Sequence, residues 1–170
     1  YTLTLETVSR SDDLSIAAGS SAELVASQIN AIAKDHGVMA AAATRVEFSG
    51  PTVSGTASFS LESLNQKPIA ISAELSVSDL TDFAQKINEV ANQTGVRAHL
   101  SDDKLRVVME SETGKDIIVS NFSYAGTIDT QVVDGRTQSL TGAVKLGDGE
   151  NDTARYSGAV SYTHLRAHET

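Results

Sequence analysis

The sequence predicts an α+β fold made of two duplicated units, each a short helix packed on antiparallel strands, followed by a β-rich segment. Three observations support this prediction. A helical pattern of apolar residues occurs twice at a constant offset, apolar and polar residues alternate around both copies, and only strand and turn patterns follow residue 122. The expected divisions are a first unit over 1–66, a second unit over 67–122, a β-hairpin segment over 123–160, and a disordered or non-native tail over 161–170.

Two stretches carry the repeat, QINAIAKDHGVMA (residues 28–40) and KINEVANQTGVRA (residues 86–98). Both contain Ile-Asn, then Ala, then Gly-Val-x-Ala, without a gap and 58 residues apart. The apolar residues around them have the spacing of one helix face. They are Ala22, Val25, Ala26, Ile29, Ile32 and Ala33 in the first copy, and Leu80, Phe83, Ala84, Ile87, Val90 and Ala91 in the second. The shared identities favour an internal duplication over two unrelated amphipathic helices.

The helix ends are also marked in the sequence, and they place the helices at about 20–36 and 78–94. Ser20 and Glu23 have the spacing of a capping box, and Ser78 is positioned to cap the second helix. Both copies then reach a glycine, where a left-handed residue is expected to end the helix.

Two further residues of the repeat are polar, namely Asn30 and Asn88. We expect both to lie at the edge of the polar helix face. In that position, replacing either asparagine by alanine would cost little stability. A large cost would mean instead that they bind a buried backbone group.

Strands are predicted wherever the apolar period changes from helical spacing to two. The expected strands are Thr2–Val8, Leu14–Ala17, Val38–Phe48, Thr56–Leu61, Leu105–Ser111, Asp116–Ser120, Thr127–Val133, Arg136–Lys145 and Thr153–Val160. Asp134-Gly135 predicts a two-residue hairpin between two of them.

The composition excludes several classes of function. The chain has 170 residues, no cysteine and a formal net charge of −9. Without cysteine there is no disulfide or thiolate chemistry. Because phosphate binding requires clustered Lys and Arg, the acidic balance argues against nucleic acid and against an anionic membrane surface. No apolar run approaches the roughly 18–20 residues of a spanning helix.

Histidines and acidic residues are the candidates for metal or catalytic sites. His36 falls at a helix end and His99 in a short strand, while His164 and His168 have helical metal-ligand spacing and are followed by Glu169. The order is not H-E-x-x-H, and this segment belongs to the predicted tail. No metal site is predicted from the histidines.

The acidic residues form three groups. The run 148–152 alternates oxygen ligands as calcium loops do, but it lacks the Gly at the sixth position and the acidic residue at the twelfth. Asp102-Asp103 and the pair Glu110 and Glu112 are expected at turns or strand edges. Gly114-Lys115 has no phosphate-binding glycine upstream. We therefore expect no enzyme, no catalytic, cofactor-binding or metal-binding residues, and no cofactor.

The duplicated element resembles the flagellin hook IN motif of bacterial flagellar filament proteins. The second copy matches it in order, with Ser78-Asp79-Leu80, Ile87-Asn88, Gly95-Val96-Arg97-Ala98, the strand Leu105–Ser111, Thr113-Gly114 and Asp116–Val119. Upstream, GTASFSLES and IAISAEL resemble the strand pair that precedes the motif in large flagellins. The resemblance covers about residues 14–122. Unlike flagellins, this sequence has no long heptad-patterned helices at its ends.

The resemblance implies a surface-exposed outer domain of a flagellin, a structural component of the extracellular flagellar filament that supports motility. Its partners would be other flagellin subunits, bound through terminal regions that this sequence lacks, and surface glycans or host receptors. Two alternatives remain: a domain of the filament cap (hook-associated protein 2), which carries the same motif, and a carbohydrate-binding or adhesive module. A sugar site would need a groove of exposed aromatic side chains, for which the candidates are Phe59, Phe122, Tyr124 and Tyr156. An enzyme grafted on the same scaffold would need a cluster of histidines and carboxylates.

Overall fold

A computed structural model describes residues 2–6, 11–33, 37–65, 67–134, 137–149 and 151–164. Its first elements are β1 (Thr2–Glu6), β2 (Ser11–Ser15), α1 (Ala22–Ala33) and β3 (Val38–Ser49). The next elements are β4 (Gly55–Glu62), β5 (Ile69–Leu75), α2 (Thr81–Glu89), α3 (Ala91–Thr94), β6 (Val96–Leu100), β7 (Arg106–Ser111) and β8 (Ile117–Ser123). β4 lies before the expected boundary at residue 66, but because it forms a hairpin with β5 it is grouped with the second unit. The chain ends with β9 (Thr127–Val133), β10 (Leu140–Gly147), β11 (Asp152–Tyr156) and β12 (Ala159–His164). This is the predicted α+β fold, with antiparallel strands in three sheets and three short helices among the described residues.

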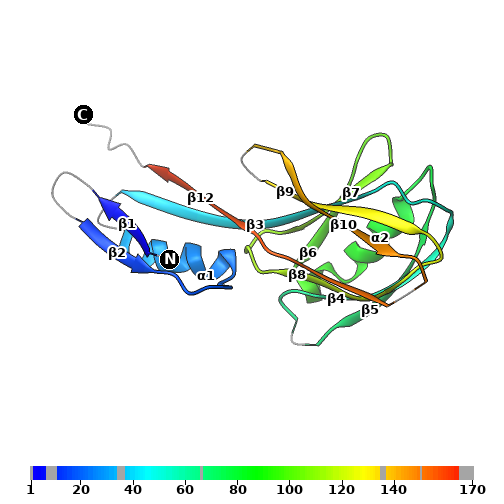
Figure 1. Ribbon diagram of the computed structural model, residues 1–170, viewed down its shortest axis with the longest axis horizontal. Coiled ribbons are helices and arrows are strands. Elements are labelled where there is room, and N and C mark those ends of the chain that lie inside the picture. The colour runs from blue at the N-terminus through cyan, green and yellow to red at the C-terminus, as the bar shows by residue number, and fades with distance from the viewer. Residues whose placement is uncertain are drawn as a thin grey trace.

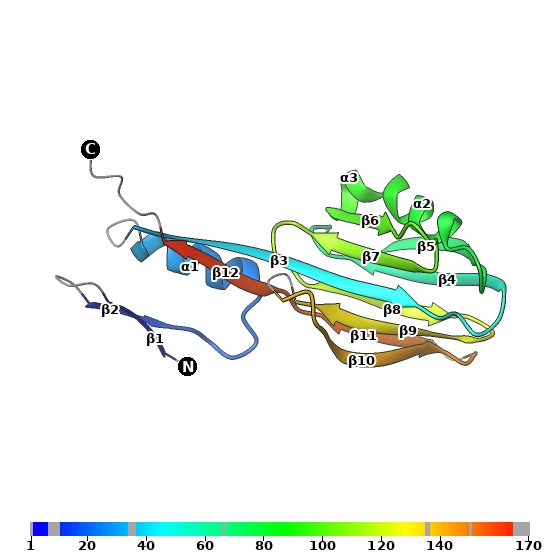
Figure 2. The ribbon, with the colours of Figure 1, turned by 90° about the horizontal axis from the view of Figure 1, so that it is seen from above.

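The molecule is elongated and has two lobes joined by β3 (Figure 1). The larger lobe contains one sheet in the order β11-β8-β4-β5 and most of a second sheet in the order β10-β9-β3-β7-β6. The smaller lobe contains the β1–β2 hairpin, α1, the first half of β3, and β12 (Figure 2). Residues 38–43 of β3 pair with β12, and residues 44–49 pair with β7. One continuous strand therefore belongs to both lobes.

The core of the larger lobe lies between its two sheets and α2. Phe83 of α2 packs against Phe48 of β3 and Phe59 of β4, with ring centroids 5.5 and 5.6 Å away. Phe122 of β8 lies 5.7 Å from Phe59. These four rings join the helix to both sheets, so the apolar face of α2 has the buried position that its spacing predicted.

The predicted duplication is visible in the helices and the strands that follow them. Ile29 and Ile87 are both buried, and α1 lies on β3 as α2 lies on β6. Gly37 and Gly95 both have positive φ, 63° and 70°, and the Gly95 N–H donates to the Ala91 carbonyl at 2.8 Å. The left-handed residue expected after the second helix is confirmed; the end of the first helix, residues 34–36, lies outside the described residues.

The helix starts differ from the prediction. Ser20 does not cap α1; its hydroxyl donates to the Ala17 carbonyl, and the Ser21 hydroxyl accepts from the Leu24 N–H at 3.3 Å. The predicted capping box fails because α1 begins one residue later than that pattern requires.

The second helix shows a similar shift. Asp79, not Ser78, satisfies an N–H at the start of α2, since its carboxylate accepts from the Thr81 N–H at 2.8 Å. This helix is also interrupted at Val90, where φ is −106°, and so forms α2 and α3 instead of one helix over 78–94.

The C-terminal strands also differ from the expectation. The predicted strand 153–160 is two strands, β11 and β12, which belong to different sheets. β12 continues to residue 164 and so includes part of the expected tail; residues 165–170 lie outside the described residues. The β9–β10 hairpin exists, but Val133 pairs with Leu140, so its loop spans 134–139 instead of two residues. Within the described ranges, no helix is long and apolar enough to cross a membrane.

We predict that Ile87→Asp destabilises the protein by about 3 kcal/mol or more, because it places an unpaired carboxylate in a fully buried site. Urea unfolding followed by circular dichroism measures the change. Gln85→Asp, on the exposed side of α2, adds the same charge and should change stability by less than about 0.5 kcal/mol. Equal losses in both variants would show that α2 does not bury the face described above.

Stability should also fall between about pH 10 and 12. Burial raises the pKa of Tyr156 from an ordinary value of 10.0 to about 12, although its hydroxyl donates to Thr130 Oγ1 at 2.8 Å. The unfolded chain loses this proton first, so stability is complete below pH 10 and decreases by about 3 kcal/mol as pH rises to 12. Burial also raises the pKa of Tyr124, which adds to the decrease.

Unfolding free energies measured from pH 9 to 12 test this, with Tyr156→Phe as the matched variant. It should lose the part of the pH dependence that Tyr156 causes and retain the rest, to which Tyr124 and Lys86, whose pKa is raised by Glu89, contribute. An unchanged slope in this variant would contradict the assignment.

Candidate functional site

Each copy of the repeat contains an asparagine that binds the backbone of the strand after its helix. Asn88 Nδ2 donates to the Ala98 carbonyl at 2.9 Å, and the Ala98 N–H donates to Asn88 Oδ1 at 2.8 Å. Asn30 makes the same two bonds with Ala40, both at 2.8 Å. The four residues are again related by the offset of 58. We call these two arrangements the asparagine clamps.

The clamp satisfies backbone groups that face away from the neighbouring strand. In an antiparallel strand the N–H and C=O of one residue point to the same side, and this side alternates along the chain. β6 pairs with β7 and is the last strand of its sheet, so the outward groups of Ala98 would lack a strand partner. The Asn88 amide supplies one donor and one acceptor, as a neighbouring strand would. Ala98 is buried, so water is a poor substitute.

The first clamp has the same relation to β3. Residues 38–43 of β3 pair with β12 on one side, with Ala40 opposite Tyr162. The Ala40 N–H and C=O point to the other side, where α1 lies, and Asn30 binds them. In the second unit the corresponding neighbour is β7, with Ala98 opposite Met109. β12 therefore occupies in the first unit the position that β7 has in the second.

This result corrects the expectation for the two asparagines. They lie at the edge of the helix face, as predicted, but they are not simply solvated: each connects its helix to a sheet edge. The residues around them have matching roles, since the isoleucine before each asparagine is buried and the glycine turns the chain back toward the strand. The sequence did contain a signal, because both asparagines precede an alanine by ten residues.

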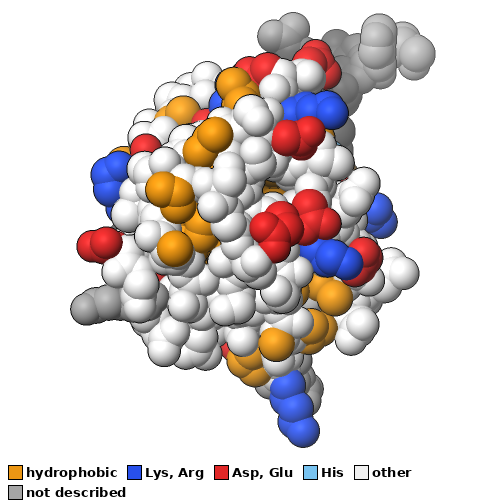
Figure 3. Space-filling view, turned by 90° about the vertical axis from the view of Figure 1, so that its right-hand side faces the viewer, with side chains coloured by type: hydrophobic (Ala, Val, Ile, Leu, Met, Phe, Trp, Pro, Cys, Tyr) orange, Lys and Arg blue, Asp and Glu red, His pale blue; other side chains and the backbone are white. Residues whose placement is uncertain are grey.

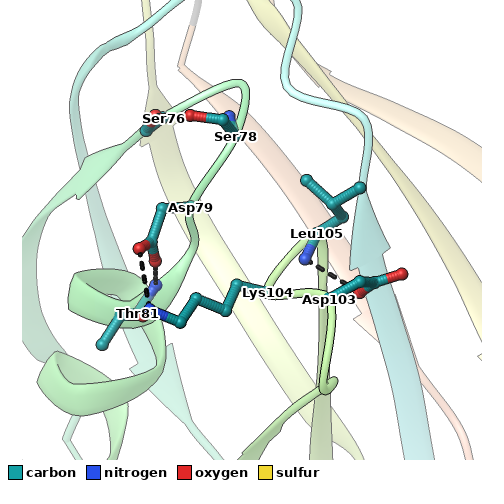
Figure 4. A network of polar contacts seen from close by, with 7 residues as sticks. All are labelled: Ser76, Ser78, Asp79, Thr81, Asp103, Lys104 and Leu105. Atoms are coloured by element: carbon teal, nitrogen blue, oxygen red, sulfur yellow. Dashed lines mark hydrogen bonds and ion pairs between the residues drawn. The ribbon is translucent and has the colours of Figure 1, made fainter.

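A second polar network ties together the loops at the far end of the larger lobe (Figure 4). Asp79 accepts from the Thr81 N–H and pairs with Lys104 Nζ at 3.3 Å, while the Lys104 carbonyl accepts from the Leu80 N–H at 2.9 Å. Hydrogen bonding by Thr81 holds the pKa of Asp79 below its ordinary value, and a bond from Ser101 does the same for the pKa of Asp103. These carboxylates are exposed and act as turn acceptors.

The end face of this lobe is mixed in character. Small groups of apolar side chains alternate with acidic and basic ones (Figure 3). Three loops that are hydrogen-bonded to one another each expose one apolar side chain: Val53, Val77 and Leu105, between 42% and 52% exposed.

The histidines and acidic residues considered for metal binding do not come together. No group of three or more His, Cys, Asp or Glu side chains in the described part of the chain has the geometry to hold a metal ion. His99 Nε2 lies 3.3 Å from Glu110 Oε2, and the Arg45 guanidinium pairs with the same carboxylate. His36, His168 and Glu169 lie outside the described residues.

The remaining sequence candidates have structural contacts. In the run 148–152, Asp152 accepts from the Gly147 N–H at 2.7 Å, which is a turn contact. Gly114 lies where the two lobes meet: its φ is 76°, its carbonyl accepts from the Glu23 N–H at 3.1 Å, and a Cβ there would lie 2.3 Å from Ala42 Cβ.

The aromatic residues considered for sugar binding are all buried. Each is 3% exposed or less: Phe59, Phe122, Tyr124 and Tyr156. These four rings are part of the core and cannot form a surface for stacking sugars.

The clamps lead to a specific stability prediction. Asn88→Ala should cost about 2 kcal/mol, because two hydrogen bonds are lost and the Ala98 groups remain buried. Asn88→Asp should also destabilise at neutral pH, since a carboxylate can accept from the Ala98 N–H but repels its carbonyl. Asn92→Ala, on the exposed side of α3, is the control and should change stability by less than about 0.5 kcal/mol. Chemical denaturation measures all three, and a neutral Asn88→Ala would exclude a stabilising role for the clamp.

Comparison with known proteins gives weak matches among solved structures. No family model and no curated protein matches the chain. Among solved structures, the D2–D3 domains of the flagellar cap protein FliD from Escherichia coli match 74% of this chain and 89% of that chain, with 12% sequence identity and a TM-score of 0.27. This is a weak structural similarity to domains of a flagellar protein.

Proposed function

We propose that the chain is a surface-exposed outer domain of a bacterial flagellin, with a structural role in the extracellular flagellar filament. The observation that supports this most directly is the presence of both asparagine clamps within the two copies of the Ile-Asn…Gly-Val-x-Ala pattern. The resemblance to the flagellin hook IN motif therefore involves residues with the same contacts in both copies. A chance match of two short patterns would not place the asparagine and alanine of both clamps at matching positions.

The physical character of the described residues fits such a role. The molecule is elongated and strand-rich, with a net charge of −9. Its polar side chains mainly stabilise turns and strand edges, as the Asp79 and Asp103 networks do. Acidic, turn-stabilised surfaces suit a domain that faces solvent and avoids self-association.

The proposal includes the partners. Subunits of the filament would contact one another through long helices in parts of a flagellin outside this domain, leaving the domain free on the outside. Reading the coding DNA next to this segment tests that part. Heptad-patterned segments on both sides would support it, and their absence from a complete reading frame would contradict it.

Antibodies raised against the purified chain test the location. Immunogold electron microscopy of cells that produce the protein should show label along the whole length of the flagellar filament. Label confined to the filament tip would instead favour the filament cap, the main alternative. Label elsewhere on the cell, with bare filaments, would overturn both assignments, and cells without the gene serve as the control for antibody specificity.

A further inference from the structure

The two units differ in the pairing of their hairpins. In the second unit, β4 is paired on both sides, with β5 and with β8. In the first unit the β1–β2 hairpin also precedes the helix, but among the described residues β1 pairs with β2 alone. Within the described part of the chain, one edge of β1 therefore lacks the strand that its counterpart has.

The difference appears in the burial of the hairpin side chains. Ala57 and Phe59 of β4 point into the core and are 0% and 3% exposed. Leu3 and Leu5 of β1 alternate with exposed residues in the same way, but both are only half-buried. β1 therefore has an apolar face that the rest of the structure covers only partly.

β8 shows what covers this face in the second unit. Its residue Phe122 is fully buried and packs on Phe59, and its backbone pairs with residues 58–62 of β4. In the first unit, a groove of about 300 Å³ lies next to the hairpin and is lined by Leu3, Ile16, Val25, Ile29 and five other residues. Val25 is the counterpart of Phe83, so a smaller helix residue leaves space here.

We propose that the free edge of β1, together with this groove, binds an extended peptide strand. The strand pairs with residues 2–6 as β8 pairs with β4, and it places a large apolar side chain beside Leu5. Backbone hydrogen bonds along a sheet edge give affinity in this type of binding, and alternate side chains give specificity. The described hairpin residues include the carboxylates of Glu6, Asp12 and Asp13, so the partner is a strand with alternating apolar residues and neutral or basic flanks.

The sequence of β8 provides the probe. A synthetic peptide of residues 116–123, with two lysines added at each end, is titrated into the isotope-labelled full chain, and backbone amide shifts are followed by NMR. The amides of residues 2–6 should shift and their hydrogen exchange should slow, while the amides of β4 remain unchanged. A peptide carrying Phe122→Ser should bind at least about tenfold more weakly, since it loses the large buried side chain.

Matched protein variants locate the site. Leu5→Lys places a charge on the inward face of β1 and should weaken peptide binding at least tenfold. Thr4→Lys adds the same charge on the exposed face, and binding should stay within about twofold of the original chain. Hydrogen exchange in β4 and β8 verifies that both variants keep the larger lobe folded.

Three outcomes would overturn the proposal: no shifts at millimolar peptide, shifts only at another sheet edge, or equal effects of Leu5→Lys and Thr4→Lys. Protection of residues 2–6 without peptide, together with a dimer in sedimentation, would also overturn it by showing that a second copy occupies the edge. None of these outcomes bears on the flagellar location, because the proposal rests on the pairing of β1 alone.

Discussion

The need to satisfy main-chain groups on both sides of a buried strand shapes this molecule. Each repeat places a strand directly after its helix, with a neighbouring strand on only one side near the helix. The outward N–H and C=O of the central alanine must find partners, and a helix presents none from its own backbone. An asparagine in the last turn of each of these helices is long enough to reach them and offers both a donor and an acceptor. The distance between helix and strand is then fixed by the clamp as well as by apolar packing.

Other features follow from this arrangement. The isoleucine before each asparagine is on the inner face, so the clamp and the core contact are made by adjacent residues. The chain must reverse direction within a few residues to bring the alanine opposite the asparagine, and the left-handed glycine makes this turn without steric cost. The motif is thus a set of linked requirements, which explains why the same residues recur at the same spacing in both units.

The sequence predicted the parts of the fold that depend on local patterns. The buried helix faces, the glycine turn at 95 and most strands follow from apolar spacing and turn residues, because these patterns report burial directly. Adjacent polar residues were less informative: Ser20 and Ser21, or Ser78 and Asp79, can each cap a helix, and the exact starting residue decides between them. The pairing of β12 with β3 joins residues about 120 positions apart, and no local pattern specifies it. The clamps were missed because an asparagine at a helix edge usually faces water.

The clamps also explain how the two units can differ elsewhere and still keep a common core. A clamp binds the outward N–H and C=O groups of its strand, whichever sheet the strand belongs to. β6 can therefore be the edge of a large sheet, while the first half of β3 pairs with a distant strand. Outside the clamp, the second unit contains Phe83, Phe59 and Phe122, which join two sheets, whereas the first unit has smaller residues and a separate apolar cluster. The smaller lobe consequently relies more on backbone pairing and less on packing. We expect the elements of the smaller lobe to unfold locally at a lower free energy than the core of the larger lobe, because fewer large side chains lose their contacts when these elements open.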